Sequence, residues 1–213
     1  MSAKAVCEEK NTQPHTVNLL GVTPLDLEHI AVRIYEKKKS GKNVAGKVLS
    51  TWAMEDDLEV LSHALEAEVN LVVSSVGLRT AKYLEKEYKM PYVVGTPVGT
   101  FTEEIVQALE KKERYPYKRL REENSDKEQP GSGKNDKEVM LIGEPVTTES
   151  LALAIEQKYG ISVHVLCPLQ ETEDLLFRTS RKVLGEEDME EALKDADIIA
   201  ADPLYRPICP KKM

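Results

Sequence analysis

The stretch VNLVVSSVGLRTAKYLEKEYKMPYVVGTPVGTFTEE, residues 69–104, decides the fold. Its pattern predicts a buried strand, a turn of small residues, an amphipathic helix, a second strand, another small-residue turn and the start of a helix. One apolar face with the three- and four-residue spacing of a helix is formed by Leu78, Ala81, Leu84 and Tyr88. Open α/β sheets bind ligands outside the carboxyl ends of their strands, so these turns are where a site is expected.

The same alternation extends in both directions along the chain. Strands are predicted at 17–22, 47–53, 69–75 and 92–98, and then at 139–144, 162–169 and 196–202. Helices are expected between them, including one that opens at Thr23, one at 171–182 and an acidic one at 186–195. Strands that alternate with helices of this length imply parallel βα units. The predicted fold class is therefore α/β, with two Rossmann-like, doubly wound, mostly parallel sheets, the second smaller and truncated at three strands.

A change of composition predicts the domain boundaries. Residues 111–138 are highly charged and poor in aliphatic side chains, and from Glu122 onward they cannot bury enough apolar surface to become ordered. We therefore expect a polar tail at 1–13, a first Rossmann-like domain at 14–117, a charged linker at 118–137 and a second domain at 138–213.

Composition and charge disfavour several classes of protein. The net charge of −8 opposes binding to nucleic acid, and no apolar run reaches the roughly 18 residues of a membrane span. The first residues lack the apolar core of a signal peptide, so we expect a cytoplasmic protein. Gly131-Ser132-Gly133-Lys134 departs from a phosphate-binding loop and fits a flexible linker.

The cysteines give no sign of a metal site. Cys7, Cys167 and Cys209 are far apart in the sequence and form no C-x-x-C pair, so a metal centre made by this chain alone is not expected. Cys167 shares one face of a predicted strand with Val163 and Val165, which indicates a buried core residue.

The candidate binding residues are small or polar and lie where predicted strands end. They are Gly21, Thr23, Thr51, Ser74, Ser75, Gly77, Gly95, Thr96, Gly143 and Asp202. Small side chains admit a ligand to the backbone, and the first N–H groups of a following helix are unpaired. No catalytic residue is assigned, because Ser74 and Ser75 have no identifiable base partner and a nucleophile without one is inert.

The order of these motifs resembles the nitrogenase component 1 family. VNLLGVTPLD (17–26), the strand ending at Trp52 with Glu-Asp-Asp-Leu beyond it, and EVNLVVSS (68–75) with LRTAKYLEKEYKMPYVVGTPVG (78–99) are similar to the family's middle domain. Residues 139–207, with Gly-Glu-Pro after the first strand and ADIIAADPLYRP at the end, are similar to its last domain. The family includes nitrogenase molybdenum–iron protein subunits, cofactor-assembly scaffolds, and protochlorophyllide and chlorophyllide reductases.

The resemblance also implies what differs in this chain. Family members usually carry a preceding domain whose cysteines hold an iron–sulfur cluster, whereas only Cys7 precedes the first strand here, which indicates a short form without that domain. In the cofactor-bearing nitrogenase subunit, the turn after Asn-Leu-Val supplies a cysteine ligand; the matching position is Ser74, and the arginine of that turn falls at Val76. The family's closing segment, beyond the Asp-Pro-Leu-Tyr stretch, is not seen.

These implications lead to three functional hypotheses. The first is a nitrogenase component 1-like protein of an oxidoreductase system, which contributes a domain pair to a site completed by a partner chain. The partner would be a cysteine-bearing subunit, a reductase ATPase or a second copy of the chain. Any iron–sulfur or other metallocofactor would be held in that complex and not by this chain alone, and any catalysis would belong to the complex. The second is a non-catalytic module that binds a small molecule or metallocofactor. The third is a fragment with a structural role.

Overall fold

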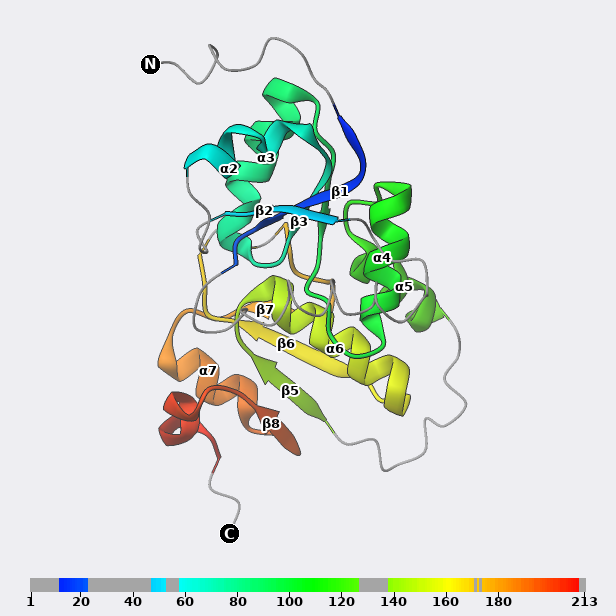
Figure 1. The fold of residues 1–213 in the computed structure, drawn as a ribbon. Coiled ribbons are helices and arrows are strands. Elements are labelled where there is room, and N and C mark those ends of the chain that lie inside the picture. Colours follow the sequence, from blue (N-terminus) through cyan, green and yellow to red (C-terminus); the bar gives the residue numbers. More distant parts are fainter. Residues whose placement is uncertain are drawn as a thin grey trace. The chain divides into compact units, whose positions relative to one another are not determined.

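The computed structural model of the chain describes residues 12–22, 47–52, 58–126, 138–170, 172 and 174–210. Its contacts divide the chain into two compact units (Figure 1). Unit 1 comprises residues up to 97 together with 102–116, and unit 2 comprises 98–101 together with the residues from 117 onward. Each unit contains a four-stranded sheet in which all neighbouring strands are parallel. The predicted α/β class with two Rossmann-like sheets is confirmed.

The sheet of unit 1 has the order β2-β1-β3-β4. Its strands are β1 (Gln13–Leu20), β2 (Lys47–Thr51), β3 (Ala67–Val72) and β4 (Tyr92–Val94). All four predicted strands are found, but each ends two to four residues before its predicted end, at 20, 51, 72 and 94. The small residues that follow have left the ladder and belong to the turns that carry the candidate site.

The helices of unit 1 include one with the predicted apolar face. They are α2 (Leu58–Ser62), η2 (Ala64–Glu66), η3 (Ser75–Gly77), α3 (Leu78–Tyr88) and α4 (Phe101–Lys111). Helix α3 buries Leu78, Ala81 and Leu84, and the residue after it, Lys89, adopts the left-handed conformation and donates its N–H to Glu85 O. The helix predicted to open at Thr23 lies outside the described residues.

A row of polar side chains crosses this sheet in its buried interior. Asn18 on β1 is paired in register with Asn70 on β3 and Ser50 on β2. Asn18 Nδ2 donates to Asn70 Oδ1 (2.9 Å) and Ala64 O (2.7 Å), while Ser50 Oγ donates to Asn18 Oδ1 (2.7 Å). Within the described ranges Asn70 Nδ2 is buried without a hydrogen-bond partner, so this row carries a desolvation cost of about 1–3 kcal/mol beside its bonds.

The sheet of unit 2 has the order β7-β6-β5-β8. Its strands are β5 (Val139–Ile142), β6 (Val163–Cys167), β7 (Arg181–Lys182) and β8 (Ile198–Ala200). The accompanying helices are α5 (Pro116–Asp126), α6 (Pro145–Tyr159), α7 (Glu186–Leu193) and η4 (Pro203–Ile208). Helix α5 includes residues 118–126 of the stretch expected to be a linker, and residues 127–137 lie outside the described part.

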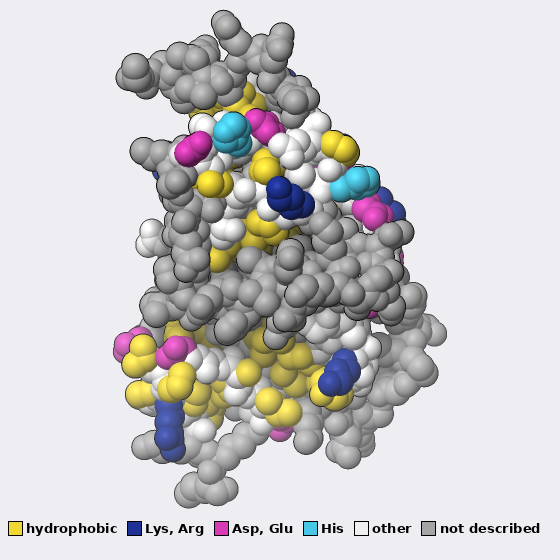
Figure 2. All heavy atoms as spheres, in the orientation of Figure 1, with side chains coloured by type: hydrophobic (Ala, Val, Ile, Leu, Met, Phe, Trp, Pro, Cys, Tyr) yellow, Lys and Arg dark blue, Asp and Glu magenta, His cyan; other side chains and the backbone are white. Residues whose placement is uncertain are grey.

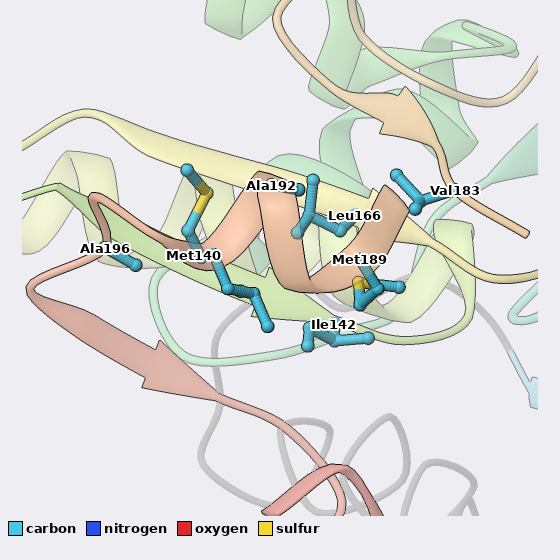
Figure 3. Close-up of a cluster of buried hydrophobic side chains, with 8 residues drawn as sticks. Met140, Ile142, Leu166, Val183, Met189, Ala192 and Ala196 are labelled. Atoms are coloured by element: carbon cyan, nitrogen blue, oxygen red, sulfur yellow. The ribbon is translucent and has the colours of Figure 1, made fainter. Parts of the chain in front are cut away.

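Both faces of the second sheet are covered, as the period of two along a strand requires. Met140 and Ile142 of β5 pack with Met189 and Ala192 of α7 on one face (Figure 3). The intervening Val139 and Leu141 pack with Ala152 of α6 in a second cluster. Cys167 of β6 is fully buried, as predicted from its place on the strand.

The prediction of a helix at 171–182 is wrong. Among the described residues of this stretch, 174 and 175 are in a turn, and Arg181–Lys182 form β7, which pairs with β6. Its apolar residues, Leu175 to Phe177, are consecutive and do not have helical spacing. Side chains of other helices bond to two of their backbone groups: Tyr117 Oη donates to Leu175 O (2.7 Å), and Phe177 N donates to Glu149 Oε1 (2.9 Å). The sheet therefore gains a fourth strand where three were expected.

Candidate functional site at the strand ends

In unit 1 the turns after β1 and β3 are packed directly against each other. Ser74 is 5% exposed, and its Oγ donates to Gly21 O at 2.6 Å. Val73 N donates to Leu20 O at 3.0 Å, which continues the pairing of the two strands into their turns. Three candidates, Gly21, Ser74 and Gly77, are thus brought together, but they face one another.

The two glycines of this contact are required by the space available. Gly21 has φ +82°, and a Cβ built on it would lie 2.6 Å from Ser74 Oγ and 2.9 Å from Gly77 N. A Cβ on Gly77 would lie 2.6 Å from Leu20 C and 2.7 Å from Leu20 O. Backbone atoms cannot move aside as a flexible side chain can, so the small residues here serve close packing between the turns.

The turn after β3 also uses its own N–H groups. Gly77 N donates to Ser74 O at 3.1 Å, and the N–H of Leu78 donates to Ser75 O. The short 3-10 helix η3 therefore occupies two donors that were expected to point at a ligand. At this turn Ser75 is half-buried, and Val76 is the most exposed side chain at 67%.

The other unit 1 candidates have separate positions. Thr96 is buried, with Oγ1 donating to Val73 O at 2.7 Å, and Gly95 N donates to Val72 O at 3.0 Å. Thr51 is the half-buried last residue of β2 and is paired with Leu19. Thr23 lies outside the described residues. Hydroxyls and backbone groups therefore make up this rim, and its described polar contacts hold the turns in place.

In unit 2 the helices that follow β5 and β8 are capped at their N-termini by the chain's own carboxylates. Glu144 Oε2 accepts from Thr147 N (2.8 Å) at the start of α6, next to Gly143, and Asp202 Oδ1 accepts from Leu204 N (2.9 Å) at the start of η4. A carboxylate at a helix N-terminus satisfies a free donor and the helix dipole. The negative charge that it places there disfavours an anionic ligand at Gly143 or Asp202.

Two surface pockets are lined by residues other than the candidates. One, of about 260 Å³, is at the amino ends of β1 and β3 and is lined by His15, Thr16, Val17, Glu68, Val69, Leu109 and Glu110. The other, of about 560 Å³, follows Asp202 along the chain and is lined by Pro203, Arg206, Pro207, Cys209 and Pro210. Of the candidates, only Asp202 is next in sequence to one of these two pockets.

Side chains that could coordinate a metal do not gather in the described part of the chain: it contains no group of three or more His, Cys, Asp or Glu residues with suitable placement. Cys167 Sγ contacts Thr172 Oγ1 at 3.4 Å, and Cys209 Sγ lies 3.3 Å from Tyr205 O. Cys7 is outside the described residues. No described helix combines the length and apolar character needed to cross a membrane.

Sequence reasoning did not single out the polar row of unit 1, although a signal was present. The triplet Val-Asn-Leu occurs at 17–19 and again at 69–71, and the structure pairs these triplets in register. An asparagine in the middle of an apolar strand must find hydrogen bonds inside the core. Two such residues at matching places therefore indicate a shared network on adjacent strands.

Replacing Ser74 with alanine is expected to destabilise the chain by about 1 kcal/mol, because it removes the hydrogen bond that joins the two turns. Denaturant unfolding measures the change. Ser62→Ala is the matched control, since the Ser62 hydroxyl is exposed and bonds only to the nearby Glu59 O in the described contacts; its effect should stay within about 0.5 kcal/mol. Equal stability of Ser74→Ala and the wild type would show that this contact does not hold the turns.

A family model for nitrogenase component 1 type oxidoreductases matches residues 1–203. The chain is also similar to one subunit of light-independent protochlorophyllide reductase from three organisms. It is 37% identical over 101 residues to the protein of Staurastrum punctulatum, 35% over 101 residues to that of Zygnema circumcarinatum and 33% over 102 residues to that of Angiopteris evecta. The matched stretches cover 45%, 46% and 47% of this chain, in that order, and 20% of each relative.

Proposed function

The chain belongs to the nitrogenase component 1 type oxidoreductase family, and on this basis we propose that it works within an oxidoreductase assembly. It contributes two Rossmann-like units to a site that a partner chain completes. The partner is a cysteine-bearing subunit, a reductase ATPase or a second copy of this chain. The relatives that it matches are themselves named as subunits of a reductase, which supports a role in a complex.

The observation that carries this proposal is the state of Ser74. It stands where the resemblance indicates a cysteine ligand in the cofactor-bearing nitrogenase subunit. Its Oγ is buried and donates to Gly21 O, and a neutral hydroxyl is a poor iron ligand compared with a thiolate. Ser74 therefore does not fit the role of metal ligand, and no step of a reaction is assigned to a cofactor on this chain. The ligands of a metallocofactor would come from the partner.

Exposed apolar side chains on unit 2 support the requirement for a protein partner. Leu204 is 86% exposed and follows the edge strand β8, on which Ile198 is also exposed. Figure 2 shows hydrophobic side chains on the face of unit 2 that carries β5 and β8. Where exposed apolar side chains form a contiguous patch, that patch is characteristic of a protein-interaction site.

Anaerobic reconstitution of the purified chain with iron and sulfide tests the division of labour. After removal of unbound metal, we expect no stoichiometric iron or sulfide on the chain and no charge-transfer absorption in the visible region. The Ser74→Cys variant serves as a comparison, because its thiol would replace the hydroxyl that faces Gly21 and should not by itself capture a cluster. Stable, stoichiometric uptake by the wild-type chain would contradict the proposal.

A thermal-stability screen separates the proposed role from that of a non-catalytic binding module. Anything that binds only the folded state raises the melting temperature by mass action. The screen includes tetrapyrroles, because the relatives are named as protochlorophyllide reductases, together with nucleotides and metallocofactors. A concentration-dependent shift with the chain alone favours the binding module, whereas a shift that requires the partner supports the shared site.

A further inference from the structure

Unit 2 contains a buried charge cluster that the proposed function does not use. Arg121 of α5 is 2% exposed, and its guanidinium donates to Glu149 Oε2 and, through Nη2 and Nε, to Glu156 Oε1 (2.8 Å) and Oε2 (3.1 Å). Nη2 also donates to Val163 O of β6 (2.5 Å). Phe177 completes the enclosure, with its ring centroid 4.6 Å from Arg121 Cζ. The cluster joins α5 to α6, to β6 and to the turn before β7.

The cluster has more negative than positive groups. Arg121 is the one cation bonded to both Glu149 and Glu156 in the described contacts, and the two glutamates lie on the same helix. Lys118 also faces Glu149, but its ammonium faces Asp174 and Glu122 as well. Two carboxylates that share one guanidinium in a desolvated place leave a surplus negative charge, which is costly in a low-dielectric interior.

We propose that this cluster is a proton-responsive latch. Uptake of one proton at Glu156 removes the surplus negative charge and strengthens the packing of α5 against the rest of unit 2. Glu156 is the member that solvent can reach, with 14% of its side chain exposed against none for Glu149. Its oxygens also accept from Val163 N (3.2 Å). No bond is made or broken in the chain other than the transfer of a proton from solvent.

The direction of the pH response follows from linkage. Burial raises the pKa of Glu156 above its ordinary value of 4.5, against the opposing effect of Arg121. In the window between the ordinary and the raised pKa, the folded state binds more protons than a state in which α5 has detached. The attachment of α5 therefore strengthens as the pH falls through that window and weakens as the pH rises through the raised pKa.

Native-state hydrogen exchange of the α5 amides tests the latch. Between about pH 5 and pH 8, after correction for intrinsic exchange, wild-type protection should rise as the pH is lowered, by up to about tenfold per pH unit where one proton is taken up. Glu156→Gln copies the shape of the protonated acid, so its α5 should stay protected with no such dependence. As a control, Glu123→Gln on α5 alters an exposed ion pair with Arg119 and should keep the wild-type pH response.

Infrared spectroscopy of the wild type gives a readout that does not depend on how a variant folds. A carboxylic acid C=O band should persist above the pH at which ordinary glutamates are ionised, and Glu156→Gln should lack it. In the hydrogen-exchange experiment, the amides of α3 in unit 1 provide an internal reference. Their protection should not change with pH in the same way. Flat protection of α5 across the pH range, or an unchanged response in Glu156→Gln, would overturn the proposal.

Discussion

Replacing Arg121 with methionine is expected to lower the free energy of unfolding by about 3–5 kcal/mol, the largest effect of any single substitution considered. The variant keeps a long apolar stem but leaves Glu149 and Glu156 without the guanidinium that contacts both. It also removes the donor to Val163 O and the contact with Phe177. Chemical denaturation followed by circular dichroism measures the loss.

Two further variants show whether charge is the cause. Arg119→Met on the same helix breaks an exposed ion pair with Glu123 and should cost less than about 1 kcal/mol. Adding Glu149→Gln and Glu156→Gln to Arg121→Met should recover part of the stability, because buried charges no longer lack a partner. A loss below about 1 kcal/mol for Arg121→Met would mean that the cluster does not hold α5.

Alanine at Gly21 is expected to destabilise unit 1 by about 3 kcal/mol. A left-handed backbone costs a residue with a Cβ roughly 1–2 kcal/mol, and overpacking a close contact adds about 1–3 kcal/mol. Both apply here, because φ is +82° and the new Cβ would lie 2.6 Å from Ser74 Oγ. The same denaturation experiment measures the change, with the Ser74 contact expected to be disrupted.

Gly160 provides the matched control for backbone conformation. It also has a left-handed φ, +66°, but among the described neighbours nothing lies within 4 Å of a Cβ built on it. Gly160→Ala should therefore cost only about 1 kcal/mol, from conformation alone. If Gly21→Ala is no worse than Gly160→Ala, the close packing of the β1 and β3 turns does not contribute to stability.

The periodicity of the sequence was a good guide to the elements but not to every helix. The spacing of Leu78, Ala81 and Leu84 predicts a helical face, and α3 buries these three residues. The segment at 171–182 was expected to be helical, yet its apolar residues follow one another and are held by Tyr117 and Glu149. Those partners come from other helices, and no local pattern contains them.

Candidate residues could be placed at strand ends from the sequence, but what they contact could not. The carboxylates beside Gly143 and at Asp202 cap the helices that follow them, and that local role is readable from a Pro after an acidic residue. The enclosure of Ser74 by Gly21 depends on a contact between residues 53 positions apart. The sequence alone does not show that two residues this far apart are in contact, because the contact depends on which strands are neighbours in the sheet.

By itself the sequence determined that this chain forms two parallel sheets with helices between their strands. Strand and helix periods alternate along the chain, and both can be recognised from local side-chain patterns. It also determined the order of the strands and turns along the chain, whereas each predicted strand ends a few residues earlier than expected. Only the tertiary structure decided that the turn hydroxyl of Ser74 faces the chain's own backbone and that Arg121 is buried between Glu149 and Glu156. Those contacts join segments that are far apart in the sequence. Which segments come into contact depends on how the sheets and helices pack together.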